Sequence, residues 1–283
     1  MSESQPPRRG RFPLPLSATT PVVRRFVSTG QAVLQPVPPR PQRPASEITR
    51  ETARPAILAG HGLDSDGFRA RMIERLRADG CRDEHVLRAM SRVPRHLFVD
   101  SALAAQAYED TSLPIGHGQT ISKPSVVARM LGLLRQRPGG AQLGRVLEIG
   151  TGCGYQAAVL CRLASQVYSI ERLKALHDRA RENLAPMRRD QLRLIYGDGL
   201  HGHGPNAPFD AIIAAAGGHA IPQAWLDQLA VCGRLVAPMH DAQRGTQVLV
   251  VVDRMPDGSL VQHRHETVRF VPLESGTSDY KPA

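Results

Sequence analysis

The architecture follows from residues 145–155, which read Arg145-Val146-Leu147-Glu148-Ile149-Gly150-Thr151-Gly152-Cys153-Gly154-Tyr155. The first half is a short apolar run, as expected of a strand that is buried on both faces. Glycines follow at every second position, and an apolar helical pattern then covers residues 155–163. Glycines at this place let backbone N–H groups and a helix start approach a ligand closely. The stretch therefore predicts a ligand-binding unit of strand, glycine loop and helix.

Strands and helices alternate on the C-terminal side of this unit. Repeated βα units predict an α/β fold with a doubly wound, Rossmann-like parallel sheet. The last two strands have no helix between them, which predicts an antiparallel edge. Further helices are expected at 173–184 and 222–229, and strands at 146–149, 167–171, 192–196, 209–215, 234–238, 246–252 and 267–271.

The N-terminal side predicts a small helical subdomain. Apolar residues recur at helical spacing from Phe68 to Leu76, and Gly80 follows as a stop signal. A second helix is expected from about Asp83 and ends before Pro94. Two short helices cannot form a core alone, so they are expected to pack on the more C-terminal part of the chain. An irregular part and a third helix are expected at residues 110–124 and 125–134.

The chain is expected to divide into an extension, one folded domain and a short tail. Residues 1–60 hold eleven of the 23 prolines and lack apolar periodicity, which predicts a disordered Pro/Arg-rich extension. A docking peptide is the alternative for this extension. Residues 61–275 form the domain, and 276–283 form the tail. Within the domain, residues 61–135 are the helical lead-in and lid, and 136–275 are the ligand-binding α/β core.

Charge and composition limit the class of partner. The formal charge of the 283 residues is +10, but residues 1–50 carry eight Arg and two acids, a net +6. The remaining +4 is too small to indicate a nucleic-acid-binding body. Four cysteines lie far apart without a C-x-x-C pair, so reduced thiols fit a cytoplasmic protein.

Membrane insertion and export are not expected. Apolar runs are far shorter than the roughly 18 residues of a spanning helix. Arg8-Arg9 and the acid-poor start suggest a secretory or transit signal as the alternative. Pro13, Pro15 and Pro21 interrupt any apolar signal core, so cytoplasmic localisation is the prediction.

Two acidic side chains at strand ends indicate a nucleoside ligand. Glu171 lies 21 residues after Gly150, where a carboxylate can accept hydrogen bonds from both ribose hydroxyls. Asp198, followed by Gly199, ends the third strand and can accept from an adenine amino group. The alternative is that these are ordinary strand-end turns.

The glycine spacing selects the ligand. A dinucleotide loop, G-x-G-x-x-G, needs glycine where this chain has Tyr155. The observed G-x-G-x-G after the acidic Glu148 is the pattern of S-adenosylmethionine-dependent methyltransferases. We therefore expect S-adenosylmethionine as the cofactor, with Glu148, Gly150, Gly152, Glu171, Asp198 and Gly199 lining its pocket.

A second block gives a specific resemblance. Residues 113–124, Leu113-Pro114-Ile115-Gly116-His117-Gly118-Gln119-Thr120-Ile121-Ser122-Lys123-Pro124, resemble the hallmark of protein-L-isoaspartate O-methyltransferases. The likeness runs from about residue 66 to 275. It includes Val93-Pro94-Arg95-His96-Leu97-Phe98-Val99, Ala107-Tyr108-Glu109-Asp110, residues 146–158, Ser169-Ile170-Glu171-Arg172, Ala207-Pro208-Phe209-Asp210 and Arg269-Phe270-Val271-Pro272-Leu273.

The resemblance implies a class I methyltransferase that repairs damaged proteins. It would methylate the free α-carboxylate of L-isoaspartyl residues in proteins and peptides, with Ser122 as the active-site serine. Gln119 and Thr120 would help to form the cofactor lid, and Gln247 would be a later cofactor contact. A carboxylate of pKa near 3–4 is already ionised at neutral pH, so the reaction needs alignment rather than a general base. A monomer that binds neither nucleic acid nor membrane is expected.

The chain departs from the family pattern at three places. Gly217-Gly218-His219 stands where Ala-Pro or Pro-Pro is usual, and Met239-His240 stands where Val-Gly is common. Both loops are expected on the substrate side, so peptide preference is less well determined than the cofactor. Cys153 replaces a commoner serine and is interpreted as a packed thiol rather than a reactive one.

Two alternative functions and one alternative site are disfavoured. A nucleic-acid methyltransferase is disfavoured because no Asn/Asp-Pro-Pro-aromatic motif follows the fourth strand. A non-catalytic adenosylmethionine-binding adaptor is disfavoured by the intact Thr120-Ile121-Ser122 block. The pairs His201/His203 and His263/His265 lack a nearby Cys or carboxylate cluster and are interpreted as exposed side chains, so no metal is expected.

Overall fold

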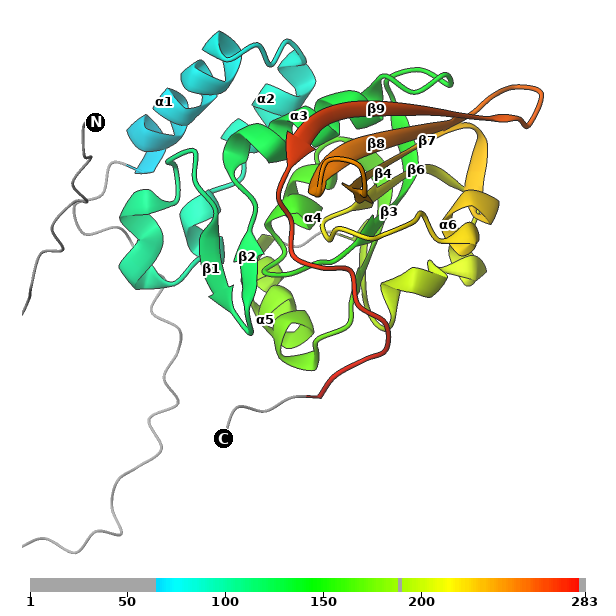
Figure 1. Ribbon diagram of the computed structural model, residues 1–283. Helices are drawn as coiled ribbons and strands as arrows, with labels where there is room; N and C mark the ends of the chain where they lie inside the picture. Colours follow the sequence, from blue (N-terminus) through cyan, green and yellow to red (C-terminus); the bar gives the residue numbers. More distant parts are fainter. Residues whose placement is uncertain (1–64, 188–189, 280–283) are drawn as a thin grey trace, which may run out of the picture. The chain divides into compact units, whose positions relative to one another are not determined.

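A computed structural model describes residues 65–187 and 190–279. The extension expected at residues 1–60, and the end of the tail at 280–283, lie outside the described residues. Within the described part, one seven-stranded sheet has the order β5-β4-β3-β6-β7-β8-β9 (Figure 1). Its strands are β3 (Leu143–Ile149), β4 (Ala164–Glu171), β5 (Leu192–Tyr196), β6 (Phe209–Ala214), β7 (Leu229–Asp241), β8 (Thr246–Arg254) and β9 (Leu260–Val268).

The five strands from β5 to β7 are parallel, whereas β8 and β9 join antiparallel to their neighbours. The predicted doubly wound sheet with an antiparallel edge is therefore confirmed. Strand order reverses around β3, so the chain after β3 and the chain after β6 leave the sheet beside one another. In open α/β sheets this switch point is where ligands bind.

Alternate residues of the strands supply two hydrophobic layers. One layer joins Val146, Ala211 and Val236 to the helices α3 (Pro124–Arg135), α4 (Tyr155–Leu160) and α5 (Lys174–Leu184). The opposite layer surrounds Trp225 of the short helix α6 (Gln223–Asp227). Both faces of the sheet are therefore covered, which explains why the central strands read as continuous apolar runs.

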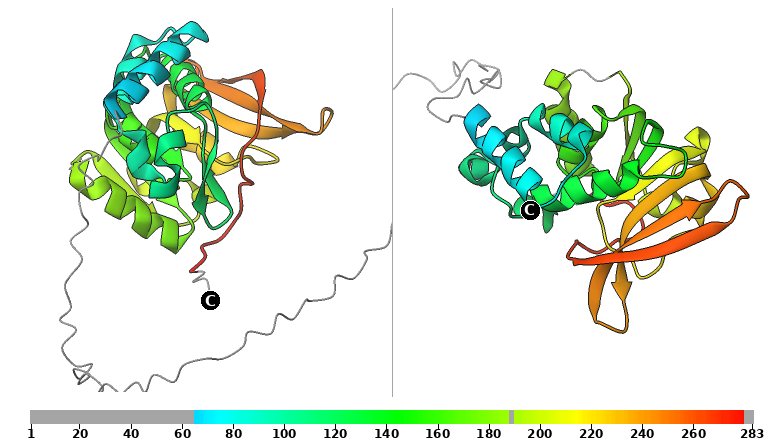
Figure 2. Two further views of the ribbon diagram at one scale, coloured as in Figure 1. Left: turned by 90° about the vertical axis from the view of Figure 1, so that its left-hand side faces the viewer. Right: turned by 90° about the horizontal axis from the view of Figure 1, so that it is seen from above.

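The helical lead-in packs on α3 rather than forming a core of its own. The helices α1 (Ser65–Ala78) and α2 (Glu84–Ser91) share the α3 layer, and cyan α1 and α2 lie beside it (Figure 2). Helix α2 begins after Asp83, whose carboxylate accepts hydrogen bonds from His85 N–H and Val86 N–H. Two 3₁₀ helices, η1 (Arg95–Phe98) and η2 (Ser101–Gln106), continue the chain.

Three expectations for local structure were wrong. Met239 and His240, expected in a loop on the substrate side, lie within β7 and pair with β8, and they line neither the cavity nor the groove described below. The stretch expected to be irregular contains an antiparallel hairpin of β1 (Leu113–Gly116) and β2 (Gln119–Ile121). The last strand is β9, and it ends at Val268 instead of covering 267–271. Most β9 side chains are exposed, so β9 shows no apolar alternation. It is held by backbone pairing with β8.

After β9 the chain crosses the carboxyl ends of the parallel strands. The Val271 carbonyl accepts from Gly217 N–H, and Gly217 in turn accepts from Leu273 N–H, at 2.8 and 2.9 Å. Further along, Ser278 N–H donates to the Arg172 carbonyl at 2.9 Å. The red segment in Figure 1 follows this course. We call residues 269–279 the C-terminal strap.

Candidate active site

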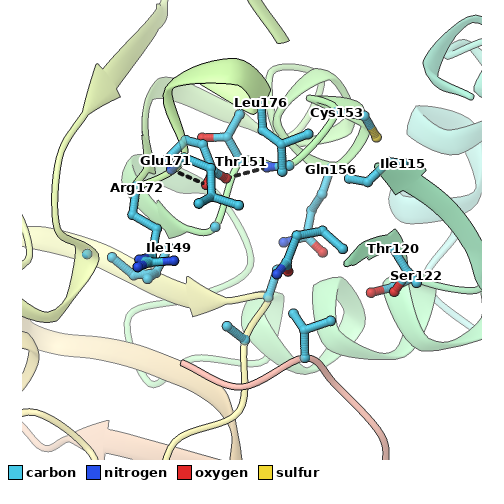
Figure 3. Close-up of a pocket in the computed structure, with 18 of the residues that line it drawn as sticks. Ile115, Thr120, Ser122, Ile149, Thr151, Cys153, Gln156, Glu171, Arg172 and Leu176 are labelled. Atoms are coloured by element: carbon cyan, nitrogen blue, oxygen red, sulfur yellow. Dashed lines mark hydrogen bonds between the residues drawn. The ribbon is translucent and has the colours of Figure 1, made fainter. Parts of the chain in front are cut away.

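A cavity lies at the carboxyl ends of β3, β4 and β6, between the β1–β2 hairpin and the C-terminal strap (Figure 3). Seven sequence-predicted residues line it: Gln119, Thr120, Ser122, Gly150, Gly152, Glu171 and Gly199. Three others, Glu148, Asp198 and Gln247, are not part of that lining. The fold thus brings the hairpin, the glycine loop and the ends of three strands together around one cavity.

The glycine loop turns tightly above β3. Gly150 and Gly152 have φ angles of +89° and +55°, which L side chains rarely adopt. The loop is tied to β4 because Gly152 N–H donates to Glu171 Oε2 at 2.8 Å. The other carboxylate oxygen of Glu171 accepts from Leu173 N–H at 2.9 Å. Each oxygen keeps a second acceptor site, so the buried carboxylate can still receive ribose hydroxyls.

Glu148 lies beneath the loop and is fully buried. Its Oε2 accepts from Ser169 Oγ at 2.5 Å, and the Ser169 hydroxyl is 2.6 Å from Thr151 Oγ1. Burial raises the pKa of Glu148 to about 8, although its hydrogen bonds oppose the shift. Thr151 itself lines the cavity. Glu148 therefore acts on the cavity through Ser169 and Thr151.

Asp198 caps a short turn at the end of β5. Its carboxylate accepts from Leu200 N–H at 2.9 Å and from Gly276 N–H of the C-terminal strap at 2.6 Å. The neighbouring Gly199 lines the cavity, and a Cβ there would lie 2.5 Å from Ile149 Cγ2. Glycine at this position thus lets the turn after β5 pack directly against the Ile149 side chain at the edge of the cavity.

Gln247 holds the C-terminal strap instead of reaching the cavity. Its Oε1 accepts from Phe270 N–H at 2.7 Å, and its Nε2 donates to the Phe270 carbonyl at 3.2 Å. This pair of bonds stands where β9 ends and aims the following residues at the cavity. Four strap residues, Val271, Pro272, Leu273 and Glu274, belong to the lining.

Most of the lining that the sequence did not predict is apolar or lies in the strap. Arg172 is the clearest missed polar residue: it lines the cavity and binds the strap through Glu274 at 2.7 Å and the Gly276 carbonyl at 2.9 Å. Its position directly after Glu171 was the available signal. The other missed side chains include Ile115, Thr151, Gln156 and Leu176.

Ser122 lies where two cavities meet. It follows β2, is partly exposed, and lines both the cavity at the strand ends and a wider groove. The groove runs between α3 with the end of α1 on one side and the end of β9 on the other. Arg129 of α3 and Glu266 of β9 form an ion pair at 2.6 Å across these walls. Ser122 therefore borders both the strand-end cavity and the larger groove.

The remaining motifs do not assemble into a second centre. No group of three or more His, Cys, Asp or Glu side chains that could hold a metal occurs in the described residues. His203 bonds Asn206 at 2.7 Å and stacks on Tyr168. The Cys153 thiol is buried, and that burial raises its pKa. No helix in the described ranges combines the length and hydrophobicity needed to traverse a bilayer.

Comparisons with known proteins identify the family of this chain. The family model "Protein-L-isoaspartate(D-aspartate) O-methyltransferase" matches residues 68–278. A protein-L-isoaspartate O-methyltransferase of Methylibium petroleiphilum is 61% identical over 98% of this chain and 100% of its own length. One of Burkholderia pseudomallei is 56% identical over 83% of this chain and 72% of its own length.

Solved structures give the same relationship. One protein-L-isoaspartate O-methyltransferase superimposes with a TM-score of 0.65 at 27% identity, covering 73% of this chain and 66% of that one. A putative protein-L-isoaspartate O-methyltransferase from Plasmodium falciparum, in complex with S-adenosyl-L-homocysteine, gives 0.61 at 26% identity, over 72% and 97%. By sequence, fold and site, the chain belongs to the protein-L-isoaspartate(D-aspartate) O-methyltransferase family.

Proposed function

We propose that this protein transfers a methyl group from S-adenosylmethionine to the α-carboxylate of L-isoaspartyl residues in damaged proteins and peptides. The observation that carries the proposal is the position of Ser122 between the strand-end cavity and the larger groove. The smaller cavity, walled by the glycine loop and the strand ends, suits a cofactor. The groove suits a polypeptide, whose carboxylate then meets the cofactor at Ser122.

The residues of the cavity fit the cofactor. Glu171 presents acceptor sites for ribose hydroxyls. Gly150, Gly152 and Gly199 have no side chains, so the cofactor can approach the backbone closely at these positions. Asp198, beside Gly199, is assigned to the adenine side, and Gln119 and Thr120 of β2 to the lid. Glu148 and Gln247 support the loop and the C-terminal strap. Bound there, S-adenosylmethionine supplies an electrophilic methyl group on a positively charged sulfur.

The chain contributes alignment and exclusion of water. The substrate carboxylate is ionised at neutral pH and needs no base. The Ser122 hydroxyl donates a hydrogen bond to one carboxylate oxygen and orients the other toward the methyl carbon. Apolar side chains such as Ile115, Ile121 and Val127 line the cavity around it and keep water from competing with the nucleophile.

The test compares two peptides of identical sequence, one isoaspartyl and one aspartyl. The isoaspartyl link shifts one methylene into the backbone, so only that peptide places its carboxylate in line with the methyl group. We expect methylation of the isoaspartyl peptide alone. Ser122→Ala should lower kcat roughly a hundredfold and leave cofactor affinity unchanged, whereas Ser101→Ala, on an exposed turn, should match the wild type. Equal methylation of the two peptides by the wild type refutes the function.

We further propose a cytoplasmic monomer that acts on polypeptides and not on nucleic acids or membranes. The net charge of residues 51–283 is only +4, which is small for a surface that binds a phosphate backbone. The edge strand β9 carries the charged Arg264 and Glu266, which disfavour edge-to-edge pairing of two copies. Sedimentation at micromolar concentration should give a single species near 30.9 kDa, and a stable dimer contradicts the monomer.

A further inference from the structure

Arg95 is a fully buried cation. It opens the 3₁₀ helix η1, and its acceptors among the described residues are two backbone carbonyls, not a carboxylate. Burial lowers the pKa of its guanidinium. A buried charge without an ionic partner is costly to fold. Arg95 therefore lowers the stability of the fold, and its contacts indicate which function it serves.

The guanidinium joins two distant stretches of backbone. Its Nε donates to the Ala107 carbonyl at 2.8 Å, and its Nη2 donates to the Ser122 carbonyl at 2.7 Å. Ala107 precedes the β1–β2 hairpin and Ser122 follows it, so one rigid planar group clamps both ends of the hairpin. Arginine is suited to this because its donors have a fixed fork geometry.

A third contact reaches the cofactor side. The Arg95 guanidinium carbon lies 4.8 Å from the centroid of the Tyr155 ring, within cation–π range. Tyr155 is the first residue of α4, directly after the glycine loop, and it lines the cavity. Phe98, also in η1, packs edge-on against the same ring at 5.6 Å. Arg95 is thus in contact with the Ser122 backbone and with the helix that begins at the cofactor loop.

We propose that Arg95 is a positioning residue that fixes Ser122 relative to the cofactor loop for methyl transfer. This inference rests on the proposed role of Ser122. Methyl transfer requires oxygen, carbon and sulfur to lie in line, and a displacement of about 1 Å can lower the rate roughly a hundredfold. Arg95 binds the main-chain carbonyl of Ser122, so it fixes the backbone position from which the Ser122 side chain extends, and it does not touch the substrate.

The test is Arg95→Lys, which keeps the charge but cannot hold both carbonyls in one plane. We expect kcat on an isoaspartyl peptide to fall about 10- to 100-fold. The affinity for S-adenosylhomocysteine, measured by calorimetry, should stay within about twofold, because Arg95 itself is not part of the cavity lining. Hydrogen–deuterium exchange should rise over residues 119–126, a readout independent of activity.

Arg234→Lys is the matched control. Arg234 is also largely buried and donates to a backbone carbonyl, that of Leu133 at 2.8 Å, but it pairs with Asp253 on the antiparallel side of the sheet. The Arg234→Lys variant should be less stable to heat than the wild type, and it should keep the wild-type kcat at temperatures where it is folded. If Arg95→Lys does not fold, Arg95→Gln removes the costly buried charge and is measured in the same way.

A double-mutant cycle separates the two proposals. If Arg95 acts through Ser122, Arg95→Lys should reduce kcat by less than about threefold in a Ser122→Ala background. Wild-type kcat in Arg95→Lys, or full additivity of the two substitutions, overturns the positioning role and leaves the repair function standing. Failure of the wild type to distinguish isoaspartyl from aspartyl peptide overturns the function instead.

Discussion

At the scale of single residues, two buried glutamates 23 positions apart have different tasks. Glu171 ends β4, lines the cavity and accepts two backbone N–H bonds. Glu148 lies within β3, outside the cavity lining, and is linked to it through Ser169 and Thr151, with the cavity-lining Gln156 as a further neighbour. Both were predicted as cofactor residues, Glu148 because it precedes the glycine loop and Glu171 because it ends the second strand. The sequence pattern does not distinguish a side chain that points into the pocket from one that points beneath it.

Replacing Glu171 by alanine should weaken cofactor binding. The carboxylate tethers Gly152 and Leu173 and offers acceptors to the ribose, so its loss removes charge-assisted hydrogen bonds. We expect a loss of roughly 1.5–3 kcal/mol in binding free energy, measured by calorimetry with S-adenosylhomocysteine. Glu182→Ala, on the exposed face of α5, is the control. Unchanged affinity in Glu171→Ala would rule out the ribose assignment.

Replacing Glu148 by glutamine should change how stability depends on pH. The folded-state pKa of about 8 lies above the ordinary value near 4.5, so between these values only the folded state keeps the proton. The associated stability is complete below about pH 4.5 and is lost as pH rises through 8. Glutamine stays neutral and has no such slope.

The measurement is urea unfolding of both proteins at pH 5 and pH 8. The free energy of unfolding of Glu148→Gln, relative to wild type, should increase between these pH values by on the order of 3 kcal/mol. Exposed Glu182→Gln should show no such trend. A constant difference between Glu148→Gln and wild type contradicts the raised pKa.

At the scale of elements, the sequence predicted those strands and helices whose apolar side chains recur at a regular spacing. The strands β3 to β8 and the helices α3 to α5 pack apolar side chains into the core, those of β5 only partly buried, and each was expected within about five residues of its bounds. Strand β9 was misplaced, and the hairpin and the C-terminal strap were missed. These depend on backbone pairing and on bonds such as Gln247 to Phe270, which join residues 23 apart and leave no local pattern.

Gln247→Ala should release the C-terminal strap. Phe270 loses both bonds that direct the chain from β9 into the cavity wall. We expect cofactor affinity to fall by about 1–2 kcal/mol and hydrogen–deuterium exchange to rise over residues 269–279. Gln243→Ala, in the exposed turn between β7 and β8, should change neither quantity. A protected strap in Gln247→Ala contradicts this role.

At the scale of the whole molecule, the described residues that line the cavity and the groove lie between Leu76 and Glu274. Eight of the chain's arginines lie in residues 1–50, outside the described part. The described lining of the site and this arginine-rich stretch are therefore separate in sequence. We expect methyl transfer to need the domain alone, and the positive charge of residues 1–50 to affect solubility or partner binding.

Removing residues 1–60 should leave peptide methylation within about threefold of the full chain, because that segment lacks a core-forming pattern. The truncated protein should bind a cation exchanger more weakly, since residues 1–50 carry a net +6. Steady-state kinetics on a short isoaspartyl peptide and salt elution provide the two measurements. A folded but inactive truncated protein would mean that the extension completes the site.

The groove that opens beside Ser122 sets a limit on the clients of this enzyme. If the groove binds the substrate, as proposed above, a damaged residue reaches the hydroxyl only when the polypeptide on both sides of it can leave its own fold and lie in the groove. Repair then proceeds at a rate set by local unfolding of the client: frayed ends and mobile loops are corrected first, and damage in a rigid core persists. Methylation of one isoaspartyl site in a folded client should therefore accelerate as that client is destabilised by mutation.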